Sequence, residues 1–171
     1  MFETEKDKYL MKHGFGATSL KAVLFDMDGV LFDSMPNHAY SWSHAMTQFG
    51  LHITPEEAYM HEGRTGGGTI DLLAQRCWGR KATEEEKQTI YKAKSDVFSR
   101  CPEAPQMPGA YELLKKVKAG GFTPMVVTGS GQISLIDRLN HNFPDIFRRE
   151  LMVTSFDVKY GKPNPEPYLM G

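Results

Sequence analysis

The sequence predicts an α/β fold, in which a doubly wound parallel sheet carries an inserted module of helices. Three observations favour it. Residues 21–25 (KAVLF) form a short apolar run that ends abruptly in the polar DMDG, residues 36–100 read as almost pure helix, and helices alternate with strands from residue 110 onward. Continuous apolar runs are typical of buried parallel strands, and alternation of helix and strand indicates a parallel sheet.

The chain divides into three parts. Residues 1–19 are polar with mixed charges, so we expect a loose tail, and no apolar stretch there resembles a secretion signal. The α/β core takes residues 20–34 and 104–171, and the helical module takes residues 35–103. Prolines at 102, 105 and 108 mark a linker back into the core.

The helical module shows clear start and stop signals. Pro36 suits a first helical turn, and residues 54–57 (TPEE) and 83–86 (TEEE) are capping boxes. The glycine cluster at 66–68 precedes an apolar helix that Gly79 ends.

In the second part of the core, the alternation is regular. A helix is predicted over 110–119, a strand over 125–127, a helix over about 132–140 and a strand from about 151.

Composition excludes several classes of protein. The chain has 171 residues, 40% hydrophobic and 24% charged, with a formal net charge of −1. We therefore expect a packed core, no nucleic-acid partner and no membrane partner. A cytoplasmic location is expected, with Cys77 and Cys101 as two buried thiols rather than a disulfide or metal site.

Asp26 and Asp28 follow the first strand directly, and Gly29 permits the backbone to turn between strand and helix. A carboxylate can attack phosphorus when a cation stands beside it and a second group protonates the leaving oxygen. The pair therefore predicts an aspartyl-phosphate enzyme, with Asp26 as nucleophile and Asp28 as general acid/base. An acidic surface turn is the plainer alternative, which the apolar strand ahead of the pair makes unattractive.

Two further segments carry candidate phosphate ligands. Thr128-Gly129-Ser130 ends the second strand just before a predicted helix, so a hydroxyl and a backbone N–H could cradle a phosphate there. Lys162 follows the third strand between Gly161 and Pro163, where it could hold a phosphate as a point charge. Each signal alone is weak, since both are common turn sequences.

The order of DMDGV, a strand-end hydroxyl and GKPNPEP resembles the motif series of the haloacid dehalogenase (HAD) superfamily across about residues 20–171. The resemblance implies a Rossmann-like core, Mg²⁺ as cofactor and a small phosphorylated substrate. Asp26 would be nucleophile and Mg²⁺ ligand, and Asp28 would be acid/base and Mg²⁺ ligand. Thr128, Gly129 and Lys162 would bind the transferring phosphoryl group.

The family's fourth motif, which supplies further metal ligands, should follow Lys162, and the sequence ends before it. Because residues 165–170 read as a helix cut in its first turns, we expect a fragment of a longer protein.

The inserted helices resemble the cap of the β-phosphoglucomutase-like branch, in which the cap chooses the substrate. His38 stands where the mutases carry a histidine that handles a sugar hydroxyl, and a polar residue near the hinge is an equal alternative. Aligned on Gly63, the mutases hold a distal phosphate with a lysine and an arginine, where this chain has Glu62 and Gly66. A carboxylate repels a phosphate, so Glu62 makes sense near the site only as a ligand of the metal or of its water.

Such a cap glutamate is similar to that of a HAD-type inorganic pyrophosphatase, to which EAYMHEGRTG and FDVKYGKPNPEPYLM also look close. Arg64 or Lys94 could then neutralise the leaving phosphate, although Lys94 fits a solvated helix face better. The favoured interpretation is a phosphohydrolase acting on pyrophosphate. The alternatives are a β-phosphoglucomutase and an inactive fragment that acts as a binding module.

Overall fold

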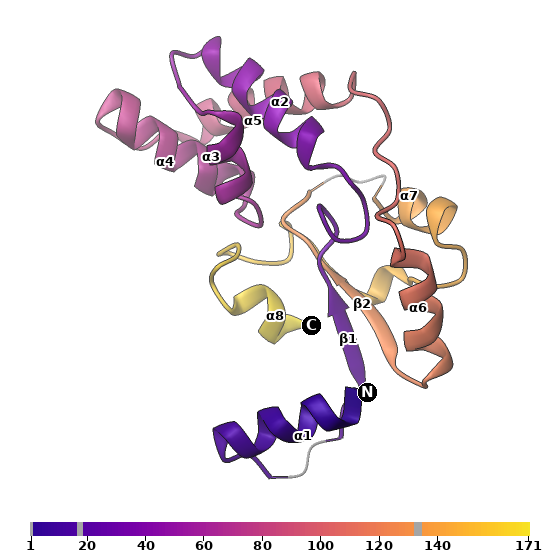
Figure 1. The fold of residues 1–171 in the computed structure, drawn as a ribbon. Helices are drawn as coiled ribbons and strands as arrows, with labels where there is room; N and C mark the ends of the chain where they lie inside the picture. Colours follow the sequence, from indigo (N-terminus) through magenta and orange to yellow (C-terminus); the bar gives the residue numbers. More distant parts are fainter. Residues whose placement is uncertain (1, 17–18, 132–134) are drawn as a thin grey trace.

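The computed structural model describes residues 2–16, 19–131 and 135–171. Its centre is a three-stranded parallel sheet in the order β1-β2-β3 (Figure 1). The strands are β1 (Ala22–Phe25), β2 (Thr123–Val127) and β3 (Met152–Val153). All three predicted strands are confirmed, and because they run parallel, their carboxyl ends meet at one edge of the sheet.

Helices cover both faces of this sheet. They are α6 (Ala110–Ala119), α7 (Leu135–Asn142) and α8 (Glu166–Met170), with a short 3₁₀ turn, η1 (Arg149–Leu151), before β3. Side chains alternate along a strand, so Phe25 and Val126 pack with Leu114 of α6, whereas Leu24 and Met125 lie against the end of α8. Figure 1 shows α6 and α8 on opposite sides of β1. The doubly wound arrangement is confirmed, and the predicted helix start at 132 lies outside the described residues.

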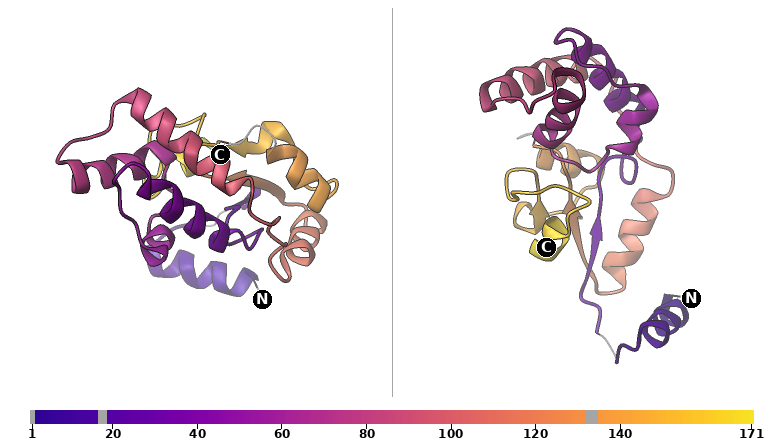
Figure 2. Two further views of the ribbon diagram at one scale, coloured as in Figure 1. Left: turned by 90° about the horizontal axis from the view of Figure 1, so that it is seen from above. Right: turned by 90° about the vertical axis from the view of Figure 1, so that its left-hand side faces the viewer.

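The inserted module consists of four helices with a hydrophobic cluster of their own (Figure 2). They are α2 (Met35–Thr47), α3 (Pro55–Met60), α4 (Gly66–Trp78) and α5 (Glu84–Phe98). Both predicted capping boxes are present, Thr54 with Glu57 and Thr83 with Glu86. Gly79 ends α4 with a φ of 72°, as predicted from its position after the apolar run. We call these four helices and their connecting loops the cap.

The chain crosses between core and cap twice, and the two crossings are tied together. The Asp33 N–H donates to the Pro105 carbonyl at 2.9 Å, and the Met107 N–H donates to the Leu31 carbonyl at 2.9 Å. These backbone bonds hold the start of α2 beside the proline-rich linker, so the cap leaves and re-enters the core at one place.

The N-terminal segment is more ordered than the expected loose tail, because residues 2–13 form helix α1 (Phe2–His13). The helix ends at Gly14, whose φ is 67°, and the Phe15 N–H closes the last turn on the Leu10 carbonyl at 2.9 Å. The rings of Tyr9, His13 and Phe15 then pack against one another, with His13 stacked on Phe15. A polar composition suggested no structure, but these local contacts and this C-cap stabilise a helix. In the part of the chain that the structure describes, no helix has both the length and the apolar composition needed to cross a bilayer.

Candidate active site

Asp26 leaves the carboxyl end of β1 and meets Lys162 from the loop before α8. The Lys162 ammonium lies 2.6 Å from Asp26 Oδ2, and it also donates to the Val127 carbonyl at the end of β2, at 3.3 Å. Asp26 Oδ1 accepts the N–H of Met27 at 2.8 Å. The predicted nucleophile and the predicted phosphate-binding cation therefore lie together, where a phosphoryl group would be shared between them. The Lys162 side chain is only 11% exposed, so it is enclosed beside Asp26.

Asp28 lies two residues after Asp26 and is buried. Its Oδ1 accepts the Ser34 hydroxyl at 2.5 Å and lies 3.2 Å from His38 Nε2. Burial by itself raises the pKa of the Asp28 carboxyl, but the bonds from His38 and Ser34, together with the charge of Lys94, hold that pKa below its ordinary value. These interactions keep the Asp28 carboxyl in its anionic form. The contact with Ser34 was missed by the sequence analysis.

Gly29 makes this geometry possible. Its φ is 76°, a conformation that side chains with a Cβ rarely adopt. Its N–H bonds to the Phe32 carbonyl at 2.8 Å, which closes a tight loop between β1 and α2. The loop turns Asp28 back toward the strand end.

Lys94 reaches the site from α5, and the expectation of a solvated helix face was wrong. The residue is 3% exposed, because this side of α5 packs against α2 within the cap. Its ammonium lies 3.0 Å from His38 Nδ1 and over the rings of Phe98 and Trp42, at 4.6 and 5.4 Å from the centroids. Burial lowers the pKa of Lys94 to about 8. His38 thus bridges Lys94 and Asp28, so it belongs to the site rather than to the hinge surface.

Glu62 follows α3 in the cap and faces the two core carboxylates. Burial raises the pKa of the Glu62 carboxyl, and the negative charges of Asp28 and Asp26 raise it further, while His38 opposes them. A carboxylate placed toward two others is unfavourable unless a cation joins them. The Arg64 side chain is exposed, although Arg64 lies at the rim of the same cavity.

The loop after β2 supplies the predicted hydroxyl. Thr128 is buried, its N–H donates to the Val153 carbonyl at 2.9 Å, and its Oγ1 accepts the Ser130 N–H at 3.0 Å. These bonds tie the loop to β3 and turn it at Gly129. The part of the predicted cradle that a helix start would add lies outside the described residues.

Some of these groups line a cavity of about 30 Å³ between cap and core, whereas Asp26, Thr128 and Lys162 do not. Its lining includes Asp28, His38, Glu62, Lys94, Gly129 and Tyr91. Tyr91 was missed by the sequence analysis, because on α5 it reads as an ordinary apolar helix position. Its ring lies where a Cβ on Gly66 would come within 2.3 Å of it, so the glycine cluster that we interpreted as a helix start also makes room for Tyr91.

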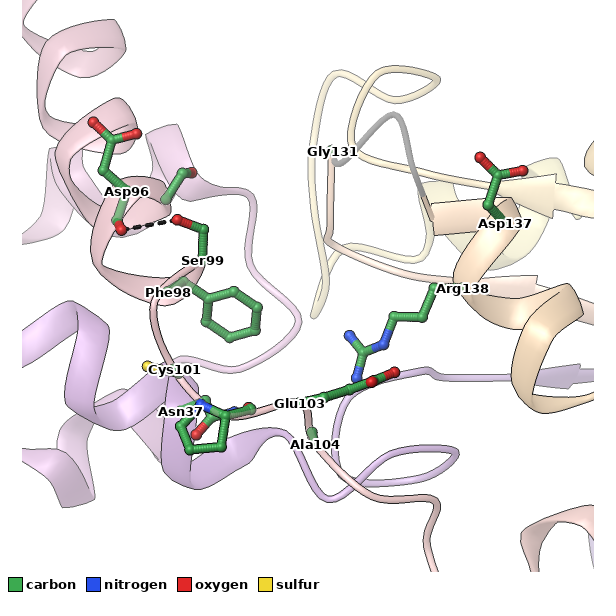
Figure 3. A pocket seen from close by; sticks show the side chains of 12 residues that line it. Asn37, Asp96, Phe98, Ser99, Cys101, Glu103, Ala104, Gly131, Asp137 and Arg138 are labelled. Carbon is green, nitrogen blue, oxygen red and sulfur yellow. Dashed lines mark hydrogen bonds between the residues drawn. The ribbon is translucent and has the colours of Figure 1, made fainter.

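A larger cavity of about 880 Å³ opens beside this one, between the end of α5, the linker and α7 (Figure 3). Figure 3 shows Arg138 pointing into it toward Glu103, and the Arg138 guanidinium lies 4.0 Å above the Phe32 ring. None of the predicted catalytic or phosphate-binding residues lines this space. Asp28 and Gly129 line the small cavity instead, so the small cavity is the one that adjoins the predicted site.

The acidic residues fit a hard divalent cation by type, since carboxylate and carbonyl oxygens are the ligands that Mg²⁺ prefers. Within the described residues, however, no three acidic, histidine or cysteine side chains converge tightly enough to form a metal centre. Asp26 is turned to Lys162 and Asp28 to His38 instead. The donor set is thus partial in this arrangement.

Comparisons with known proteins agree with this geometry. Residues 20–170 match the family model described as haloacid dehalogenase-like hydrolase. A solved structure from Bacteroides vulgatus, provisionally assigned as a β-phosphoglucomutase, is 63% identical with a TM-score of 0.90, over 96% of this chain and 66% of that one.

Curated phosphatases are more distant relatives. Hexitol phosphatase A of Escherichia coli is 31% identical over 88% of this chain and 67% of its own length. A phosphorylated carbohydrates phosphatase of Thermotoga maritima is 28% identical over 88% and 68%. The chain therefore spans about two thirds of the length of the proteins it matches. The family match, the sheet and the paired aspartates agree: the chain belongs to the haloacid dehalogenase-like hydrolases.

Proposed function

We propose that the protein is a Mg²⁺-dependent phosphohydrolase that works through an aspartyl-phosphate on Asp26, with inorganic pyrophosphate as its favoured substrate. The observation that carries the proposal is the small cavity of about 30 Å³ between cap and core, which Asp28, Glu62 and Tyr91 line. A space of this size holds about two water molecules. Only a small group can extend from the transferring phosphate without moving the cap.

The residues support a reaction in two steps. Asp26 attacks phosphorus, so that an Asp26–phosphorus bond forms and the bond to the leaving oxygen breaks, while Lys162 binds the transferring oxygens. Water then attacks the phosphorus, Asp28 takes its proton, and the Asp26–phosphorus bond breaks to release orthophosphate. The lowered pKa of Asp28 suits the second step, because a base must be unprotonated at the start.

Pyrophosphate fits this arrangement better than an alkyl phosphate. Phosphate is a good leaving group, so the first step needs little help from an acid, and Asp28 can enter it as the anion. Mg²⁺ bound at the carboxyl end of β1 would offset the charge of the substrate and of the carboxylates around it. The residues that would hold the metal are Asp26, the backbone carbonyl of Asp28, and Glu62 from the cap.

A second candidate is a mutase that returns the phosphoryl group to a sugar. It is favoured by the contact between His38 and Asp28 and by the assignment of the Bacteroides vulgatus relative. Glu62 and the small size of the cavity argue against it, because a hexose and its second phosphate need space and cationic partners. A fragment without activity, acting as a binding module, is the third possibility.

Turnover assays separate the three. Orthophosphate release would be measured with pyrophosphate, p-nitrophenyl phosphate and β-glucose 1-phosphate, and formation of glucose 6-phosphate with β-glucose 1-phosphate and its bisphosphate, each with and without Mg²⁺. We expect pyrophosphate to give the highest kcat/KM, lost on removal of Mg²⁺. Conversion of β-glucose 1-phosphate to its 6-phosphate at a higher kcat/KM would overturn the proposal in favour of a mutase, and no turnover of any substrate would favour the binding module.

A further inference from the structure

A short segment of the cap, residues 63–65, sits on the two core loops that carry the phosphate ligands. The loops are 128–131, after β2, and 161–162, before α8. A Cβ built at Gly161 would lie 2.5 Å from the Thr65 backbone nitrogen, and one built at Gly129 would lie 2.9 Å from the Arg64 carbonyl oxygen. Both contacts are to backbone atoms of the cap.

Such distances leave no room for any side chain. Real Cβ atoms do not approach other heavy atoms within 3.0 Å, and backbone cannot yield as the end of a flexible side chain can. An alanine at either position would therefore push the cap segment outward by about 1 Å to reach ordinary contact at 3.5–4.0 Å. At Gly161 the φ angle is not positive, so conformational freedom does not explain the glycine there, and the close approach does.

The contact continues onto Lys162 itself. Gly63 has a φ of 82°, and a Cβ there would lie 3.1 Å from both Cβ and Cε of Lys162. The backbone of the cap is therefore packed along the stem of the side chain whose ammonium lies 2.6 Å from Asp26. A cap held further out would leave that stem free to move.

We propose that Gly129 and Gly161 form a contact surface without side chains, which we call the seat and on which the cap packs. The seat sets how far the cap closes, and thereby which substrates the site admits. The seat lets the Gly63–Thr65 segment reach the phosphate loops, presses Lys162 toward Asp26 and limits the cavity to compact phosphoanhydrides. Gly161 is thus a specificity-determining and positioning residue that touches no reacting atom. The substrate class in this inference rests on the proposed function, whereas the seat itself does not.

The first test compares Gly161→Ala with Gly16→Ala. Gly16 also lacks a positive φ, and no described atom lies within 4 Å of a Cβ built there. A displacement of about 1 Å in a catalytic arrangement can cost about 100-fold in rate. We expect Gly161→Ala to lose about 10- to 100-fold in kcat/KM for pyrophosphate and less than about threefold for p-nitrophenyl phosphate, whose larger leaving group gains room. Gly16→Ala should change neither. Equal losses on both substrates, or none on either, would overturn the specificity role.

A second pair of variants separates strain from contact. Gly63→Ala and Gly50→Ala both place a Cβ at a positive φ, 82° and 65°, but only the first meets Lys162, and no described atom lies within 4 Å of the second. Both should lower the melting temperature by similar amounts, and only Gly63→Ala should lower kcat for pyrophosphate. A loss of kcat in both would contradict the contact with Lys162.

Small-angle scattering tests the seat without any turnover. Wild type and Gly161→Ala would be measured with Mg²⁺ and orthovanadate, which mimics a transferring phosphoryl group. We expect wild type to reach a smaller radius of gyration than Gly161→Ala. Equal radii would overturn the seat. If wild type becomes compact but does not hydrolyse pyrophosphate, the proposed substrate fails and the seat stands.

Discussion

Lys94 holds its ammonium 3.0 Å from His38 Nδ1, although 56 residues separate the two in the sequence. An ammonium can only donate, so Nδ1 must accept and the imidazole proton lies on Nε2. Nε2 faces the Asp28 carboxylate at 3.2 Å. The cap thus fixes the tautomer of His38, and through it the hydrogen bond that lowers the pKa of Asp28.

Lys94→Met should stabilise the protein at neutral pH. The pKa of Lys94 is about 8 in the folded state and 10.5 ordinarily, so between these values the unfolded chain holds a proton that the folded one has lost. The free energy of unfolding of wild type therefore rises with pH between the two pKa values. Below this range the full free-energy cost of burying the Lys94 ammonium is present. The gain should be at most about 3 kcal/mol at pH 7 and should shrink toward pH 10.

Urea unfolding of wild type and Lys94→Met at pH 7 and 9.5 measures this difference. Lys92→Met on the same helix is the control, because Lys92 is exposed. If Lys94→Met stabilises the protein equally at both pH values, Lys94 is not a buried ammonium with a lowered pKa.

His38→Ala should move the acidic limb of the pH–rate profile to higher pH. The hydrogen bond from His38 is the largest of the interactions that lower the pKa of Asp28. Without it the carboxylate takes up its proton earlier as pH falls, and the base is lost. The profile of kcat/KM for pyrophosphate would be compared with that of His44→Ala, an exposed histidine on the same helix. If the acidic limb of the His38→Ala profile stays at the pH of wild type, Asp28 is not the base.

Glu62→Ala should reduce pyrophosphate hydrolysis strongly while sparing or raising activity on larger phosphate esters. Its carboxylate faces Asp26 and Asp28, so its loss should also raise the Mg²⁺ concentration needed for half-maximal rate. The readout is the substrate ranking at saturating Mg²⁺, with Glu56→Ala as control, since Glu56 is exposed on α3. If the ranking is unchanged at full activity, the pyrophosphatase proposal is wrong and a sugar phosphatase or mutase replaces it.

Tyr91→Ala should enlarge the small cavity. Removal of a partly buried ring leaves space that its surroundings fill only in part, so kcat/KM for sugar phosphates should rise relative to that for pyrophosphate. Tyr40→Ala is the control, because Tyr40 is 56% exposed. A uniform loss on every substrate would indicate that the ring serves only to pack the cap.

The sequence predicted those parts of the site that depend on the sheet. Asp26, Thr128 and Lys162 follow strands, and the carboxyl ends of parallel strands converge whatever the cap does. Lys94 and Tyr91 could not be placed in this way. Both lie on α5, and which side of that helix is buried depends on how it packs against α2 and α4, which no periodicity within the helix records.

Two other features depended on local contacts that composition hides. Helix α1 forms in a polar segment because Gly14 and the aromatic rings packed beside it close its last turn. Gly161 reads in the sequence as an ordinary turn residue, and only the position of Thr65 across the cleft gives its reason.

The central claim is that Asp26 attacks phosphorus, and orthophosphate release by Asp26→Asn tests it most directly. An amide can neither attack phosphorus nor share charge with Mg²⁺. We predict a loss of at least about 1,000-fold in kcat for every substrate that wild type hydrolyses, a magnitude seen when one member of a catalytic set is removed. Asp33→Asn should keep wild-type activity, because Asp33 is exposed in the same loop. An Asp26→Asn variant within about tenfold of wild type would contradict the account.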